Sequence, residues 1–156
     1  MSGFITPSTP NLTDFLTFLG NTVQIPVQAL PAGSPWPGYA LDQAIGIVLN
    51  PPTSPTVVAY SLACYNCATH LLIAITPDQP AQSYFTTARG PTGFGIIQPS
   101  TGLVVAAGDQ GTTGNTQPPT WLSGLTIEDL DFMKTPWGRR FLMWQQAYGP
   151  TVWGLS

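Results

Sequence analysis

The feature that most constrains the fold is an uncharged, apolar segment at residues 57–75, with prolines on both sides. It contains no Asp, Glu, Lys or Arg. Ser54 and Pro55 are typical of an N-cap followed by proline in the first turn, and Pro77 ends the pattern. We therefore predict a long helix over residues 55–76.

Such a segment either crosses a membrane or forms the centre of a globular fold. Neither flank carries a Lys or Arg that would anchor the segment at a membrane surface. Polar residues also interrupt it, namely Ser61, Asn66, Thr69 and His70. We therefore predict a central helix that is buried on most sides, and no membrane association.

Capping signals and apolar spacing predict four further helices. Asn11 or Thr13 could cap the first, and Gly20 is a natural residue to end it. The second follows a proline-rich connection, and a capping box and a Thr-Pro pair open the last two. The four helices are predicted at about residues 11–19, 39–49, 126–133 and 136–148.

The middle of the chain has a different pattern. Residues 83–89, 94–98 and 103–106 resemble strands, and the Pro-Ser-Thr-Gly sequence at 99–102 would supply a turn, so we predict a β-hairpin region at about 83–107. Residues 108–119 resemble a loop. The expected fold is therefore mainly α: a single domain over 1–156, a small helical bundle with an inserted β-hairpin and an extended C-terminal tail at 149–156.

Charged residues are scarce throughout. Asp, Glu, Lys and Arg make up 7% of the 156 residues, against about 25% in an ordinary soluble domain. The net charge of −3 offers no basic surface for wrapping a nucleic acid. Aromatic residues are too common, at 11%, for a disordered chain. The simplest interpretation is that other proteins cover much of the surface.

Two features of the sequence concern the compartment. Residues 1–7 lack the basic and apolar regions of a secretory signal. Cys64 and Cys67 lie three positions apart in the predicted central helix, a spacing that rarely brings two sulfurs into bonding position. Both features predict synthesis in a reducing compartment.

The clearest candidate for metal chemistry is the series Cys64, Cys67 and His70, which recurs every third residue on a predicted helix. Zinc would suit these ligand types, but a structural zinc normally has four protein ligands. The sequence offers no second cysteine pair and no other histidine. Buried cysteines and one satisfied histidine are the favoured interpretation, and we predict no metal and no cofactor.

No catalytic residues are predicted either, and we do not expect an enzyme. His70 lies within an apolar helix and far from any Gly-x-Ser-x-Gly turn. The acidic group at residues 128–131 is better explained as capping of a helix N-terminus than as a pair of catalytic carboxylates.

Two segments together resemble a known family. Residues 60–72, Tyr-Ser-Leu-Ala-Cys-Tyr-Asn-Cys-Ala-Thr-His-Leu-Leu, and residues 135–141, Thr-Pro-Trp-Gly-Arg-Arg-Phe, resemble two helices of the small head–tail connector proteins of tailed bacteriophages, also called adaptor or head-completion proteins. The order of the intervening region, and of residues 37–44, is also similar to that family. The motifs are core patterns without catalytic signatures. The proline-rich loops and the apolar tail depart from the family pattern.

The resemblance implies a structural virion protein, made in the host cytoplasm and located at the junction of capsid and tail. Subunits of that family form a ring, commonly of twelve copies, that binds the portal protein and extends the channel through which DNA passes without sequence-specific binding. A tail protein or a second connector would bind the other side. Candidate portal contacts are Arg139, Arg140, Tyr148, Val152, Trp153 and Leu155. Candidate contacts with a neighbouring subunit or the tail are Phe94, Ile96, Leu103 and Val105.

Other functions stay open at this point. A tail-completion or tail-terminator ring would use similar physics on the tail side. A carbohydrate-binding module could use several tryptophans, although the sequence offers neither a secretory signal nor enough strands for one. Trp36, Trp121, Trp137 and Trp144 are the residues it would need.

Overall fold

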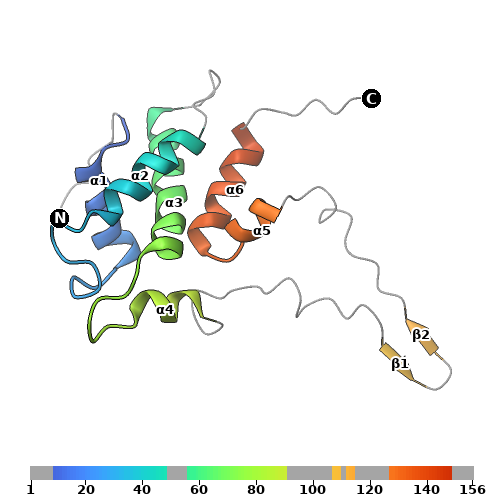
Figure 1. The fold of residues 1–156 in the computed structure, drawn as a ribbon. Helices are drawn as coiled ribbons and strands as arrows, with labels where there is room; N and C mark the ends of the chain where they lie inside the picture. Colours follow the sequence, from blue (N-terminus) through green and yellow to red (C-terminus); the bar gives the residue numbers. More distant parts are fainter. Residues whose placement is uncertain (1–8, 49–55, 91–106, 110–111, 115–126, 149–156) are drawn as a thin grey trace.

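The fold is mainly α, as predicted, and is built around one central helix (Figure 1). The computed structural model describes residues 9–48, 56–90, 107–109, 112–114 and 127–148. The predicted tail at 149–156 lies outside these described residues.

The first helix, α1 (Leu12–Phe18), begins at its predicted cap: the side chain of Asn11 accepts the amide N–H of Asp14 at 2.9 Å. The prediction that Gly20 ends this helix is wrong. The chain continues into one π-helical segment, η1 (Leu19–Val23), and turns only at Gln24, whose φ is 60°. Leu19 and Val23 are buried, so burial of the added turn outweighs the helix-ending tendency of glycine.

Helix α2 (Trp36–Ile47) begins three residues earlier than predicted, with Pro37 in its first turn. Proline fits there because the first turn of a helix does not use the amide hydrogen that proline lacks. Ala40, Leu41 and Ala44 are buried, and their spacing places them on one side of the helix. That side packs against the central helix.

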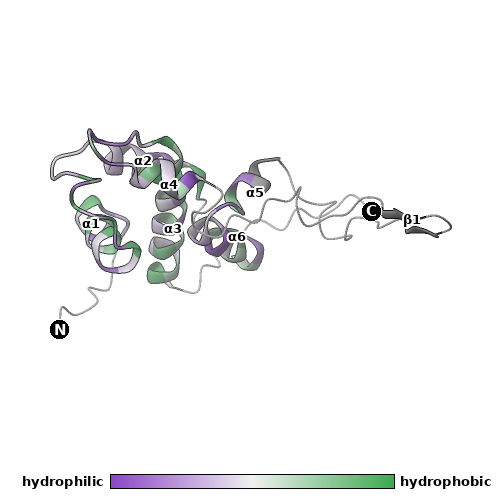
Figure 2. Ribbon diagram, turned by 90° about the horizontal axis from the view of Figure 1, so that it is seen from below, coloured by the Kyte–Doolittle hydropathy of each residue, from purple (hydrophilic) through white to green (hydrophobic). Residues whose placement is uncertain are grey.

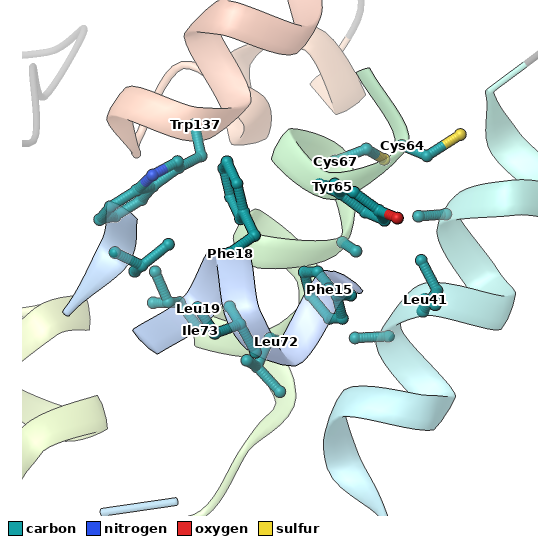
Figure 3. Packing of buried hydrophobic residues seen from close by; sticks show 14 of the residues in the cluster. Phe15, Phe18, Leu19, Leu41, Cys64, Tyr65, Cys67, Leu72, Ile73 and Trp137 are labelled. Atoms are coloured by element: carbon teal, nitrogen blue, oxygen red, sulfur yellow. The ribbon is translucent and has the colours of Figure 1, made fainter. Parts of the chain in front are cut away.

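The central helix, α3 (Val57–Ile75), is buried as predicted. Its side-chain cap is Thr56, which accepts the amide N–H of Ala59 at 3.1 Å, in place of the predicted Ser54. Figure 3 shows Tyr65 and Leu72 of this helix beside Phe15 of α1 and Leu41 of α2. By length and composition α3 could cross a membrane, yet 56% of its apolar 18-residue stretch is buried inside this fold.

Tyr65 fixes α1 on α3. Its ring stacks on that of Phe15, with centroids 5.6 Å apart. Its hydroxyl accepts the amide N–H of Asn11 at 3.2 Å. The same aromatic side chain therefore fills the core and satisfies the backbone where α1 begins.

The predicted β-hairpin over 83–107 is not supported. Its first strand is instead helix α4 (Tyr84–Arg89). Asp78 accepts the amide N–H groups of Phe85 and Thr86 at 2.6 and 3.0 Å, and Phe85 is fully buried. This capping and burial override the strand preference of the paired threonines. The other predicted strands, at 94–98 and 103–106, lie outside the described residues.

Two three-residue strands lie further along the chain, in the segment predicted as a loop. They are β1 (Ala107–Asp109) and β2 (Thr112–Gly114), which pair antiparallel with Ala107 opposite Gly114. Figure 1 shows the pair away from the helices.

The last two helices, α5 (Ile127–Phe132) and α6 (Pro136–Tyr148), agree closely with the predicted ranges. They meet in a tight corner, where a Cβ atom at Gly138 would collide with the backbone of Phe132. Burial of the aromatic side chains of α6 falls toward its C-terminus. Trp137 and Phe141 are buried, Trp144 is half-buried and Tyr148 is exposed.

Candidate functional site

Three of the predicted portal-contact residues lie on α6. Arg140 and Tyr148 are exposed, and Arg139 is half-buried. The other candidates, Val152, Trp153 and Leu155, lie outside the described residues, as do Phe94, Ile96, Leu103 and Val105. The structure therefore describes one part of the predicted contact surface.

A polar cluster joins α3 to the corner between α5 and α6. At its centre is His70, which is 3% exposed. Its Nδ1 lies 2.9 Å from Oγ1 of Thr135, and its Nε2 lies 3.3 Å from Oδ2 of Asp131. The ring of Phe132 packs on the imidazole with a centroid separation of 4.6 Å. Both ring nitrogens are thus satisfied, in agreement with the interpretation of His70 as a paired core histidine.

Thr135 links this cluster to the start of α6. Its Oγ1 accepts the amide N–H of Gly138 at 3.0 Å, the hydrogen bond expected of an N-cap residue. Its hydroxyl hydrogen can then be donated to Nδ1 of a neutral His70, which leaves the N–H at Nε2 to be donated to Asp131. In this tautomer every group in the chain of hydrogen bonds is satisfied.

Burial and charge act in opposite directions on this cluster. Burial lowers the pKa of His70 below its ordinary value of 6.5, and the attraction of Asp131 opposes that effect without cancelling it. For Asp131, partial burial acts to raise the pKa, but the hydrogen bond and positive charge of Lys134 outweigh it and lower the pKa. The resting state is a neutral imidazole beside an ionised carboxylate.

The order hydroxyl, imidazole, carboxylate is also that of a catalytic triad. Here, however, the hydroxyl belongs to a residue that is only 6% exposed, and its oxygen is already held by Gly138. This geometry ties two helices together and does not present a nucleophile to solvent.

Beside this cluster is a pocket of about 270 Å³, here called the His70 pocket. One wall is apolar, and Arg89, Asp131 and Lys134 bring charge to it. The lining residues are His70, Ile73, Ala74, Ala88, Arg89, Asp131, Lys134 and Thr135. With two cations and one ionised carboxylate, the pocket carries a net positive charge in a chain whose overall charge is −3.

Arg89 also completes the end of the central helix. Its Nη1 donates to the carbonyl oxygens of Ile73, Ala74 and Thr76 at 3.1, 3.3 and 2.8 Å. These are among the last carbonyls of α3, which have no partner within the helix itself. Sequence reasoning missed this role, because residues 83–89 were predicted as a strand and nothing in the sequence placed Arg89 near α3.

The two cysteines lie in the buried part of α3. Cys64 and Cys67 are free and fully buried. Burial raises the pKa of Cys64 to about 11 and that of Cys67 to about 12, which keeps both thiols protonated at neutral pH. Within the described part of the chain, no three His, Cys, Asp or Glu side chains are grouped to hold a metal.

Comparison with known proteins gives no match to a family model, to a curated protein or to a solved structure.

Proposed function

We propose that this chain is a structural subunit of a ring that joins the portal of a tailed-phage capsid to the tail. The proposal rests on the resemblance of two segments to head–tail connector proteins. The observation that supports it most strongly concerns the position of these segments. Residues 60–72 belong to α3, residues 135–141 include the start of α6, and the two helices pack on each other. The His70–Thr135 hydrogen bond joins one segment to the other.

The surface of the described residues supports a role in an assembly. Several large apolar side chains are exposed on it, in a chain where charged residues are scarce. Val27 is 73% exposed, Met143 69% and Tyr39 60%. Leu12 and Leu16, one turn apart on α1, are also exposed.

The exposed side of α6 is the portal-facing surface in this proposal. Arg140, Met143 and Ala147 are exposed and follow a helical spacing of three and four, which places them on one side. The combination of a cation with apolar neighbours suits a partner surface that carries a carboxylate beside an apolar recess. Tyr148, at the end of the helix, extends the same surface.

The test is co-expression with the portal protein encoded in the same genome, followed by purification through a tag on the portal. We expect several copies of the chain to remain bound and to form a ring visible by electron microscopy. Arg140→Glu should weaken the binding. The exposed Gln28→Glu, which adds negative charge far from α6 in sequence, should not. A chain that binds neither the portal nor itself rejects the proposal, and one that binds only the tail tube supports the tail-completion alternative.

A further inference from the structure

The four basic residues of the chain all belong to one part of the fold. Arg89 ends α4, Lys134 lies between α5 and α6, and Arg139 and Arg140 lie in α6. Figure 2 shows strongly hydrophilic colour at the end of α4 and on α6. Two of the four, Arg89 and Lys134, line the His70 pocket together with the apolar side chains of Ile73 and Ala88.

Three of the seven acidic residues, Glu128, Asp129 and Asp131, lie in α5 within the same part of the fold, whereas Asp42 lies apart from them on α2. Asp42 is exposed on α2 and makes no hydrogen bond or ion pair within the described part of the chain. In contrast, Asp14 accepts a hydrogen bond from the side chain of Asn11, and Asp78 caps α4. Exposed apolar side chains precede and follow Asp42 by one turn, namely Tyr39 and Ile45.

Asp42 and the His70 pocket cannot meet within one molecule. The buried residues of α2, Leu41 and Ala44, face α3, whereas Asp42 is exposed to solvent. The pocket is lined by α3, α4, α5 and the corner before α6. Figure 1 shows α2 and α6 on opposite sides of α3. Two complementary surfaces on opposite sides of one subunit are what a head-to-tail ring requires.

We propose that Asp42 of one copy of this chain enters the His70 pocket of the next copy. This inference rests on the proposed ring function and names the contact that closes the ring. The carboxylate of Asp42 lies against the ammonium of Lys134 and the guanidinium of Arg89. Tyr39 and Ile45 cover the apolar wall of the pocket, so that the contact combines charge with apolar burial.

The strength of a single such contact is modest. An exposed ion pair contributes little to the free energy of association because water and salt screen it. Partial burial in a pocket reduces this screening only in part. In a closed ring every subunit makes the contact twice, once through each surface, so a weak pair still sets which surfaces meet. Substitutions should therefore change self-association by about threefold to tenfold.

The test is a double-mutant cycle on self-association of the full chain, measured by sedimentation velocity. Asp42→Asn and Lys134→Gln should each weaken association by about threefold to tenfold, and the double variant should be no weaker than the weaker single variant. Lys134 is 53% exposed and pairs only locally with Asp131, so the fold should survive its replacement, which circular dichroism checks. Gln28→Glu is the matched control, because it changes the net charge by the same amount as Lys134→Gln at an exposed residue that does not line the pocket.

Additive effects of the two substitutions, or no effect of either, would overturn the inference. If the chain still forms rings on the portal in that case, the subunits meet elsewhere and the proposed function stands. A chain that is monomeric with and without the portal overturns both the contact and the ring. Equal coupling of Asp42 with Arg140 would also reject the pocket as the site of contact.

Discussion

Nδ1 of His70 lies 2.9 Å from Oγ1 of Thr135, although the two residues are 65 positions apart in the sequence. The contact joins the central helix to the first turn of the last one. Because Thr135 also caps α6 through Gly138, one hydroxyl group serves both the packing between helices and the start of a helix.

Replacing Thr135 should therefore have two effects at once. Thr135→Val keeps the shape of the side chain but removes the cap and leaves Nδ1 of His70 without its partner. We expect the free energy of unfolding to fall by about 1–3 kcal/mol. Urea denaturation followed by circular dichroism measures it, and Thr135→Ser, which keeps the hydroxyl, should retain most of the stability. Equal losses in the two variants would show that the hydroxyl is unimportant.

The lowered pKa of His70 predicts a loss of stability in mild acid. The unfolded chain takes up a proton near the ordinary value of 6.5, whereas the folded chain resists it until a lower pH. The contribution is therefore fully present above that value and is lost as the pH falls from 6.5 toward the folded pKa.

Urea midpoints measured between about pH 8 and about pH 5 will test this. His70→Gln, which does not titrate, should be less stable than the native chain at the upper pH but should have a flatter dependence in this range. Parallel curves for the two chains would assign the pH dependence to other groups.

The contact between Arg89 and the end of α3 predicts that this residue stabilises the central helix. Arg89→Ala leaves the carbonyls of Ile73 and Thr76 without that donor, and we expect a loss of about 1 kcal/mol. Lysine can place a charge there but lacks the planar guanidinium, so Arg89→Lys should recover only part of the loss. Hydrogen exchange at the last turn of α3 gives a local readout, and unchanged protection in the alanine variant would contradict the capping role.

Two glycines should respond oppositely to the same substitution. Gly138→Ala places a methyl group against the backbone of Phe132, and we expect it to destabilise the fold by about 1–3 kcal/mol. Gly46→Ala, within α2, has open space around the new atom. That change should stabilise the chain by up to about 1 kcal/mol, because alanine favours a helix more than glycine does. Thermal unfolding of both variants checks the difference in sign.

Local signals predicted much of the helical framework. Asn11 caps α1 as expected, the Thr135-Pro136 pair opens α6, and the uncharged segment forms α3. The two wrong predictions share a cause, which is the burial of apolar side chains in the core. Gly20 does not end its helix because burial of Leu19 and Val23 favours another turn, and residues 84–89 are helical because Asp78 caps them and Phe85 enters the core.

The candidate site was harder to predict than the fold. The sequence could indicate that His70 is buried and satisfied, since it lies in an apolar helix. It could not name Thr135 and Asp131 as partners, because their proximity depends on the packing of α5 and α6 against α3. The same holds for the pocket that Arg89 and Lys134 share, whose lining comes from segments as far apart as residues 70 and 135.

The way the central helix is completed has a consequence for synthesis on the ribosome. The hydrogen-bond partners of its polar groups come later in the chain. Arg89 donates to its last carbonyls, and Asp131 and Thr135 are the partners of His70. Helices α1 and α2 precede α3 in the chain and can cover part of it early. The side that packs on α6 is covered, and these polar groups are paired, only after most of the chain has left the exit tunnel. A chain that ends before α6 would therefore leave one side of this apolar helix uncovered and His70 without its two partners.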